Sequence, residues 1–516
     1  MPTKLIIFDL EDVLFQSWHK ISQKLDVDEQ DFKMIDHSDL RIDLQLGKIT
    51  EDRFFEEFIK MTRTKYSVEE LKTLVRESLV PIERMLDLAK GLKSRYKIAI
   101  LSNFTKEWAE YLIKKYELDK TFDATFWSFE KGIKKPWHDA YLEVTKHFNI
   151  KPEDSLLIDD KIRNTEAAVK LGFNAILFEN YERLKRELNN FGVNTRPNVV
   201  LIGGGTGLPI VISGLRKYDV NLTAIVTVMD NGRNSGQLRK DYGILPPGDI
   251  RNCLVALSDA DDTLKSAFGY RFLDGYLEGT NIGNLLLLSF TKLFGSFEEA
   301  IKQAGKILNV QGKVFPVTNA NVNVCAKYEN GMFIEGEYQI RNENKIKSSI
   351  SEIFLKSADN VKALPEVIQE IENADMIVIG PGGLYTSLIP NFLVEGVSHA
   401  VMKSNAKKVF VCNVMTQPYV TDDFTVSKHV DALEKYLGKG ALNYVVANTK
   451  YPDSEVLNHF EKLGAGIVEL DKENLNSTNV VEGDFLKNKM EFKWAELGLL
   501  THDSEKLASS LIKILK

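Results

Sequence analysis

The middle of this chain has the sequence expected at the start of a domain. Residues 199–208 read VVLIGGGTGL: a run of apolar residues typical of a buried strand, then glycines typical of a tight turn, then an apolar helix. This is how a nucleotide-binding α/β domain opens. A different strand and loop have already opened the chain at residues 4–14 (KLIIFDLEDVL). Since 516 residues are enough for two hydrophobic cores, we predict two α/β domains.

Short apolar runs alternate with helical segments in both halves, which predicts two Rossmann-like parallel-sheet domains. We expect the first over residues 1–190, with a helical cap insertion at about residues 16–88, where the sequence is polar and helical in its periodicity. Turn-forming residues 191–197 are the expected linker, and residues 198–516 the second domain. An antiparallel hairpin is expected near residues 331–340. The other expected strands are 4–8, 98–102, 155–158, 175–178, 199–202, 222–228, 376–379, 408–412 and 444–447.

Composition narrows the class of partner. The formal net charge of −7 argues against nucleic acid as a partner. The three cysteines are far apart, which indicates neither a disulfide framework nor a zinc site and fits a reducing cytosol. The start of the chain lacks a signal-peptide pattern, and glycine and proline interrupt the two longest apolar stretches. We therefore expect a cytoplasmic protein without a membrane span.

Asp9 follows an apolar strand, at the edge where a parallel sheet presents its ligand-binding side chains. A carboxylate there is able to attack phosphorus, provided that an acid/base, a cation and a metal ion assist. Glu11, two residues on, shares a side with Asp9 in an extended chain. Further candidates come from later strand ends and loops: Ser102, Asn103, Lys135, Asp159 and Asp160.

The segments FDLEDV, LSN, KKP and IDDKIRN resemble, in order, the four motifs of the haloacid dehalogenase-like (HAD) hydrolases. The resemblance covers the first third of the chain and implies Asp9 as nucleophile, Ser102 as a hydrogen-bond donor to the phosphoryl group and Lys135 as its charge stabiliser. Glu11 stands where the family usually has an aspartate acting as general acid/base. The insertion, with LxxGKIT, is similar to the cap of the sugar-phosphate phosphatase branch. The implied Mg²⁺ ligands are Asp9, Glu11, Asp159 and Asp160.

A second site is predicted after the mid-chain strand. The glycines of 203–207 allow backbone N–H groups to approach a phosphate at a helix N-terminus, and Asp230 ends the next strand, where a dinucleotide fold has its ribose-binding acid. A glycine turn at 380–385 and the polar residues 413–417 end two more strands at the same expected edge. In the stiff segment 243–252, Arg251 is suited to a bidentate contact with phosphate. Asp249 could contact a ligand or equally well cap the helix that begins there. The expected nucleotide-binding residues are Gly203, Gly204, Gly205, Thr206, Gly207, Asp230, Asn231, Asp249, Arg251, Asn252, Asn284, Gly380, Gly382, Tyr385 and Asn413.

The phrases GGGTGL, LPPGDIRNCL, GNLL, GPGGLYTSLIPN and CNVMTQ resemble the gluconeogenesis factor family (YvcK-type) of the CofD-like superfamily, from residue 199 to about residue 511. The resemblance implies a Rossmann-like domain that binds a nucleotide-sugar such as UDP-N-acetylglucosamine, with Tyr385 in contact with it. Three segments depart from the family: DNGRNSG at 230–236 replaces DDGGSSG, Gly279–Thr280 replaces Gly-His, and Thr501–His502–Asp503 replaces Arg-His-Asp.

These observations predict a bifunctional cytosolic protein. An Mg²⁺-dependent phosphatase would hydrolyse a small phosphomonoester, such as a sugar phosphate, through an aspartyl-phosphate, and would be fused to a nucleotide-sugar-binding regulator of carbon metabolism and cell shape. Two alternatives stay open for the second half. One is a CofD-like transferase of the 2-phospho-L-lactate type, and the other is a regulator that senses a nucleotide-sugar without catalysis. The sequence is compatible with an oligomer.

Overall fold

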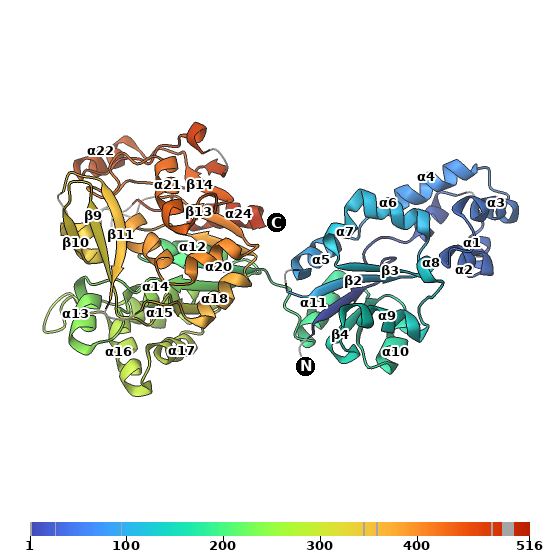
Figure 1. Ribbon diagram of the computed structural model, residues 1–516, viewed down its shortest axis with the longest axis horizontal. Helices are drawn as coiled ribbons and strands as arrows, with labels where there is room; N and C mark the ends of the chain where they lie inside the picture. The colour runs from blue at the N-terminus through green and yellow to red at the C-terminus, as the bar shows by residue number, and fades with distance from the viewer. Residues whose placement is uncertain are drawn as a thin grey trace. The chain divides into compact units, whose positions relative to one another are not determined.

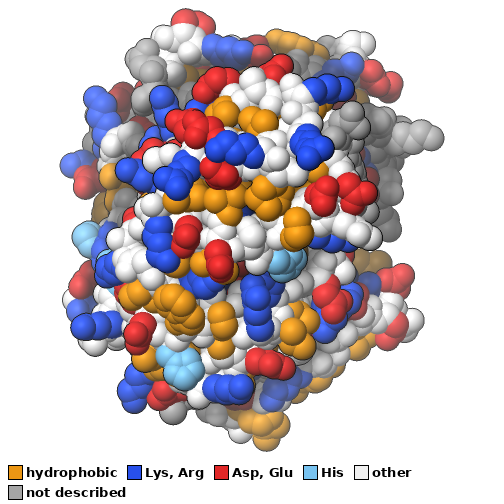
Figure 2. Space-filling model, turned by 90° about the vertical axis from the view of Figure 1, so that its right-hand side faces the viewer, with side chains coloured by type: hydrophobic (Ala, Val, Ile, Leu, Met, Phe, Trp, Pro, Cys, Tyr) orange, Lys and Arg blue, Asp and Glu red, His pale blue; other side chains and the backbone are white. Residues whose placement is uncertain are grey.

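The computed structural model describes residues 3–25, 27–93, 95–343, 346–357, 360–475, 478–487 and 500–515. The chain divides into two compact units, Met1–Thr195 and Arg196–Lys516, each built on a parallel sheet with helices beside it (Figure 1). The predicted α/β class is thereby confirmed. Within the described residues, no helix has the length and apolar character needed to cross a membrane. On the face drawn in Figure 2, lysine and arginine side chains are intermixed with aspartate and glutamate side chains.

The first unit contains a five-stranded parallel sheet in the order β3-β2-β1-β4-β5. Alternate residues of the central strand face opposite sides of this sheet: Ile6 and Phe8 join one hydrophobic cluster, Leu5 and Ile7 another. The short strand β3 was not predicted, because its first two residues are only half-buried and its apolar run is brief. The strands are β1 (Leu5–Phe8), β2 (Lys97–Ser102), β3 (Ala124–Trp127), β4 (Ser155–Asp159) and β5 (Asn174–Leu177).

Helices between β1 and β2 form the predicted insertion. Their apolar faces bury Phe54, Phe55 and Phe58 in the same cluster as Trp18 and Trp108. The insertion contains η1 (Trp18–Gln23), α1 (Glu29–Asp36), α2 (Asp39–Gln45), α3 (Glu51–Thr62) and α4 (Val68–Ser78), and α5 (Met85–Lys93) then packs against β2. The remaining helices of the unit are α6 (Lys106–Tyr116), α7 (Leu118–Thr121), α8 (Ser128–Lys131), α9 (His138–Phe148), η2 (Pro152–Asp154), α10 (Ile162–Lys170) and α11 (Tyr181–Asn190).

The second unit contains a seven-stranded parallel sheet in the order β15-β14-β13-β12-β6-β7-β8. Strand β6 lies between β7 and β12, so successive strands leave it in two directions; ligands bind at such a switch point, beyond the carboxyl ends of the strands. The partly exposed edge strands β8 and β15 were not predicted. The strands are β6 (Asn198–Gly203), β7 (Asn221–Val226), β8 (Lys313–Pro316), β12 (Met376–Ile379), β13 (Lys407–Val411), β14 (Tyr444–Asn448) and β15 (Asn479–Gly483).

A three-stranded antiparallel sheet forms a further layer of this unit, visible beside the parallel sheet in Figure 1. Its strands are β9 (Asn323–Tyr328), β10 (Phe333–Glu335) and β11 (Ile350–Lys356). The predicted hairpin near residues 331–340 is therefore correct only in its first part, since η3 (Gln339–Glu343) is a helical turn.

The helices of the second unit cover the parallel sheet and carry many of the loops described below. They are α12 (Gly207–Leu215), α13 (Arg233–Tyr242), α14 (Gly248–Leu257), α15 (Asp262–Gly269), α16 (Ile282–Phe294), α17 (Phe297–Ile307), α18 (Pro365–Glu372), η4 (Leu384–Leu388), α19 (Ile389–Phe392), α20 (Val397–Lys403), α21 (Val426–Leu437), α22 (Ser454–Lys462), η5 (Lys472–Asn474) and α24 (Ser504–Leu515).

Candidate functional sites

The carboxyl ends of β1 and β4 bring two aspartates together around one lysine. Asp9 is 3% exposed, and its Oδ1 accepts from the Leu10 N–H at 2.7 Å and lies 2.9 Å from Lys135 Nζ. The same Nζ lies 2.6 Å from Asp159 Oδ2. Because β1 and β4 are parallel neighbours, their last residues meet at one edge of the sheet. The structure thus brings Asp9 together with two residues that follow it by more than a hundred positions in the sequence.

Asparagine side chains fix the orientation of this group. Asn164 Nδ2 donates to both oxygens of Asp159, at 2.9 and 3.1 Å. Asn103 holds the backbone of Lys135 from both sides, accepting from its N–H and donating to its carbonyl at 2.8 Å each. Asn164 was not among the predicted site residues, although it ends the quoted phrase IDDKIRN.

Three carboxylates have the geometry of a cation site. Asp9, Asp159 and Asp160 each offer an oxygen within 4.8 Å of the others. Asp160 Oδ1 is buried and has no hydrogen-bond partner among the described residues, so it is free to bind a cation. An all-oxygen donor set suits Mg²⁺.

The charges of the site keep Asp9 ionised. Burial is the largest influence and would raise the pKa of Asp9, but the ammonium groups of Lys135 and Lys161, together with hydrogen bonds from Lys135 and Ser102, hold that pKa below its usual value. Burial instead raises the pKa of Asp159, and it raises the pKa of Asp160 to about 7. An ionised carboxylate at Asp9 is the form required of a nucleophile. Ser102 is 2% exposed and lies at the end of β2.

Residues of the helical insertion contact the side chain of Glu11. Its carboxylate accepts from the Trp18 N–H at 3.3 Å and lies 3.9 Å from Arg41 Nη2, and it is not part of the carboxylate group that fits a cation. The prediction of its side chain as a metal ligand is therefore not supported, because the cap offers it a donor and a charge. Arg41 itself, 2% exposed with its Cζ about 5 Å from the ring centroids of Trp18 and Trp108, gave no sequence signal.

In the second unit, glycines allow three loops to converge. A Cβ at Gly204 would lie 2.3 Å from Thr227 Cγ2, and a Cβ at Gly207 would lie 2.2 Å from the carbonyl oxygen of Pro381. The loops after β6, β7 and β12 therefore approach one another more closely than other residues would permit. Asp249 enters this junction from α14, where its Oδ2 accepts from the Gly205 N–H at 2.6 Å. Asp249 thus binds the glycine loop, and no side-chain hydrogen bond caps the start of α14 among the described residues.

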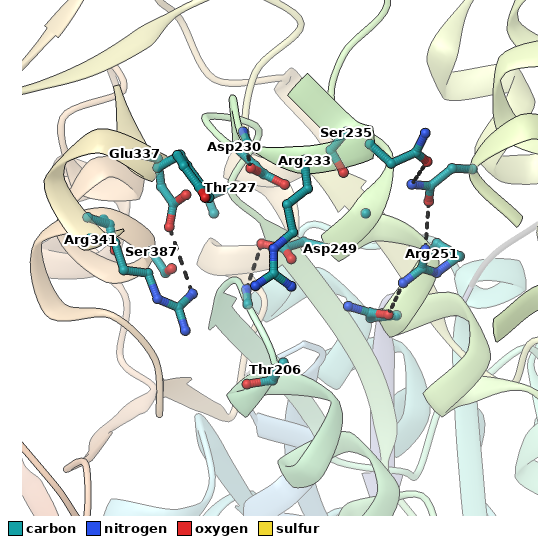
Figure 3. Close-up of a pocket in the computed structure, with 18 of the residues that line it drawn as sticks. Thr206, Thr227, Asp230, Arg233, Ser235, Asp249, Arg251, Glu337, Arg341 and Ser387 are labelled. Carbon is teal, nitrogen blue, oxygen red and sulfur yellow. Dashed lines mark hydrogen bonds and ion pairs between the residues drawn. The ribbon is translucent and has the colours of Figure 1, made fainter. Parts of the chain in front are cut away.

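A charged cavity of about 310 Å³ lies beside the Gly205–Thr206 turn (Figure 3). Burial raises the pKa of Asp249 to about 6 and that of Glu337 to about 7, with smaller contributions from Asp230. Figure 3 shows these three carboxylates around a space that Arg233 also enters. The ionisable residues on the wall are Asp230, Arg233, Asp249, Arg251, Arg271, Glu337, Tyr338 and Arg341.

Arg251 is held in place by two predicted residues. Its Nη1 donates to Asn284 at 2.8 Å and its Nη2 to Asn252 at 2.6 Å. Asn284 in turn donates to Asn234 at 2.8 Å. Burial lowers the pKa of Arg251 to about 10, so the guanidinium remains charged at neutral pH.

A neutral cavity of about 600 Å³ adjoins the same turn. It is lined by the second glycine turn, by residues 413–419 and by apolar side chains of α22 and its neighbours. Burial lowers the pKa of His502 on its wall to about 4, so this histidine is uncharged at pH 7. The two cavities share five wall residues: Gly205, Thr206, Arg341, Asn342 and Ser387.

Most of the predicted nucleotide-binding residues line these cavities. Those that line the charged cavity are Gly205, Thr206, Asp230, Asp249, Arg251, Asn252 and Asn284. Those that line the neutral cavity are Gly205, Thr206, Gly207, Gly382 and Asn413. The structure does not place Gly203, Gly204, Asn231, Gly380 or Tyr385 on either wall.

Two of these exceptions have a clear packing role. Tyr385 is 6% exposed and packs against Phe424, with ring centroids 6.3 Å apart, so the predicted ligand contact is not supported. Asn231 accepts from the Tyr338 N–H at 2.9 Å and donates to Gln339 at 2.8 Å. It anchors the segment before and within η3, whose wall residues Glu337 and Arg341 were not predicted.

Comparison with known proteins divides the chain in the same way. Residues 6–178 match the family model described as haloacid dehalogenase-like hydrolase. Residues 199–486 match the model described as 2-phospho-L-lactate transferase CofD. The family resemblances predicted for the two halves are confirmed.

Named relatives match the second unit. A putative gluconeogenesis factor of Clostridium acetobutylicum is 42% identical over 320 residues, 61% of this chain and 69% of the relative. The gluconeogenesis factor of Bacillus subtilis is 40% identical over 324 residues, 62% of this chain and 99% of the relative. The crystal structure of protein BH3568 from Bacillus halodurans is 38% identical, with a TM-score of 0.58 over 61% of this chain and 99% of that protein.

Proposed function

Because this chain belongs to the CofD family, which includes the gluconeogenesis factors, and carries a haloacid dehalogenase-like hydrolase domain before that region, we propose that it combines two activities. The first unit hydrolyses a small phosphomonoester, such as a sugar phosphate. The second binds a nucleotide-sugar, such as UDP-N-acetylglucosamine, and acts as a regulator of carbon metabolism and cell shape. The protein acts in the cytoplasm.

The observation that carries the phosphatase is the ionised, buried Asp9 beside Lys135. Asp9 Oδ attacks phosphorus, the bond from phosphorus to the leaving oxygen breaks, and Glu11 supplies the proton that this oxygen takes up. Water then attacks the acyl phosphate and gives a proton to the deprotonated Glu11, which releases inorganic phosphate and restores both Asp9 and Glu11. Lys135 and the Ser102 hydroxyl stabilise the phosphoryl oxygens. Asp9, Asp159 and Asp160 would hold Mg²⁺, which would offset negative charge on the phosphoryl group.

A panel of phosphomonoesters tests this activity on the full chain. We expect phosphate release that requires Mg²⁺, stops on addition of EDTA, and falls at least about 10³-fold in Asp9→Asn, since the nucleophile is removed. Asp87→Asn, on α5 and away from the carboxylate group, is a matched control. Equal release by the wild type and Asp9→Asn would exclude Asp9 as the nucleophile.

The observation that carries ligand binding in the second unit is the pair of cavities at the switch point, joined at a helix N-terminus. A ligand that binds only the folded state raises its unfolding temperature. We expect UDP-N-acetylglucosamine to raise the unfolding temperature of the second unit in the full chain. Arg251→Met should abolish the rise, because it removes a charge from the cavity wall. No rise with any of a panel of nucleotide-sugars would contradict the proposal.

The charged cavity also favours a second candidate for this unit, a CofD-like transferase. Asp249 and Glu337 have pKa values of about 6 and 7, which suit proton transfer near neutral pH. Release of nucleotide from a nucleotide-linked donor on addition of a hydroxyl acceptor would establish transfer. Binding without release would leave the domain a sensor.

A further inference from the structure

The charged cavity and the neutral cavity of the second unit differ in charge although they meet at one turn. Three carboxylates and four arginines line the charged cavity, whereas Arg341 is the one side chain charged at pH 7 among the described residues of the neutral cavity. Such different walls suit different parts of one ligand, because charged groups recognise hydroxyls and phosphates while neutral polar and apolar groups recognise a heteroaromatic ring.

The shared boundary has the chemistry of an anion site. Gly205 and Thr206 immediately precede α12, whose N-terminus carries a partial positive charge. Arg341 lies on both walls, 4.0 Å from Glu337, and the hydroxyl of Ser387 faces the same boundary. A diphosphate spanning the turn would meet the helix end and the guanidinium together.

The neutral cavity offers both an amide and apolar surface to a nucleobase. The side-chain amide of Asn413 is already paired with the backbone of Gly382, donating at 2.8 Å and accepting at 3.0 Å. Gln417 is half-buried, and its side-chain amide makes no hydrogen bond with the described part of the chain, so both its donor and its acceptor are available. Met415 and Phe460 supply apolar surface for the ring.

The charged cavity offers acceptors for hydroxyl groups. Figure 3 shows the carboxylates of Asp230, Asp249 and Glu337 pointing into the space beside Arg233. Sugar hydroxyls donate well to carboxylates, and these bonds are strong in a partly buried site. A uracil ring has few donors to offer them.

We propose that the ligand lies across the Gly205–Thr206 turn in one orientation: the nucleoside in the neutral cavity, the diphosphate at α12 and Arg341, and the sugar in the charged cavity. This orientation rests on the proposed binding of a nucleotide-sugar. It assigns base recognition to Gln417 and sugar recognition to Asp230 and Glu337.

Calorimetric titration of the full chain with UDP and with UDP-N-acetylglucosamine tests the orientation. Gln417→Ala should weaken both ligands by the same factor, about tenfold, since loss of a hydrogen bond to the base affects both. Glu337→Gln should leave the affinity for UDP unchanged and weaken UDP-N-acetylglucosamine about tenfold. Gln369→Ala and Glu366→Gln, the same changes at exposed positions of α18, should alter neither.

The opposite pattern would overturn the orientation alone: loss of UDP affinity in Glu337→Gln, or unchanged UDP affinity in Gln417→Ala. Binding of neither ligand by the wild type would overturn the proposed function and this orientation with it. Thermal unfolding shows whether each variant is folded. Met415→Ala and Asp230→Asn repeat the test from each cavity, and their expected patterns are those of Gln417→Ala and Glu337→Gln.

Discussion

A single lysine balances two buried carboxylates in the first unit. Lys135 Nζ lies within 3 Å of both Asp9 and Asp159, and all three side chains are at most 4% exposed. Burying three charges is favourable only while they compensate one another. The lysine therefore supports the fold as well as the proposed chemistry.

We expect Lys135→Met to lower the free energy of unfolding of the first unit by about 3–5 kcal/mol, because two carboxylates lose their partner. Mg²⁺ should restore part of this loss, since the cation replaces the missing charge. Urea unfolding in EDTA and in Mg²⁺ measures both effects. Lys134→Met, at the neighbouring half-buried lysine, is the control and should change stability little. Equal losses in the two variants would contradict this account.

Glu337 makes the stability of the second unit depend on pH. Burial raises its pKa from 4.5 to about 7, so the folded state retains a proton that the unfolded state releases. The free energy of unfolding that this retained proton contributes is fully present below about pH 4.5 and is lost as the pH rises through 7. Glu337→Gln lacks the loss and should be more stable than the wild type at pH 8, by about 3 kcal/mol. Unfolding curves of the wild type and of Glu337→Gln between pH 4.5 and 8 check this prediction. If the free energies of unfolding of the two proteins changed with pH in parallel, Glu337 would not be the cause of the pH dependence.

At the level of elements, apolar runs in the sequence predicted the interior strands. The residues of the candidate sites are far apart in the sequence and come together only in the folded chain. Strands such as β1, β6 and β12 are buried throughout and were predicted from uninterrupted apolar residues. Edge strands β3, β8 and β15 are partly exposed and were not predicted, whereas β5, an edge strand that is also partly exposed, was predicted from the apolar residues 175–178. The wall segment at Glu337 was missed because its anchor, Asn231, lies 107 residues from Tyr338.

Asn231 should affect ligand binding without contacting the ligand. Asn231→Ala removes both anchors of the segment that carries Glu337 and Arg341, and we expect a loss of about 1–2 kcal/mol in stability together with weaker ligand affinity. Asn231→Asp retains the acceptor for the Tyr338 N–H and should lose less stability and less ligand affinity than Asn231→Ala. Calorimetry and urea unfolding of both variants measure this. Unchanged affinity in Asn231→Ala would show that the segment needs no anchor.

The whole molecule consists of two units with separate sheets and separate hydrophobic clusters. Each unit has the size and core of a domain that folds independently. The two strand-and-loop openings, from which two domains were predicted, each form an interior strand: β1 of the first sheet and β6 of the second.

Separately produced fragments 1–195 and 196–516 should therefore each unfold in one cooperative transition. We expect the first to retain Mg²⁺-dependent phosphate release and the second to retain nucleotide-sugar binding. Circular dichroism and the two assays compare the fragments with the full chain. Loss of either activity in its folded fragment would show that the units depend on each other.

The bond between Asp249 and the Gly205 N–H has a consequence for ligand binding. Without ligand, the glycine loop is satisfied by a carboxylate of the protein itself, so an incoming phosphate competes with that carboxylate for the same donor. With a pKa of about 6, Asp249 is driven toward its neutral form when a phosphate approaches. Binding near neutral pH should then take up a proton from solution, and affinity should fall between pH 6 and 8. Titrations in buffers of different ionisation enthalpy would measure this uptake, which Asp249→Asn should abolish. The loop would thus couple ligand occupancy to the acidity of its surroundings.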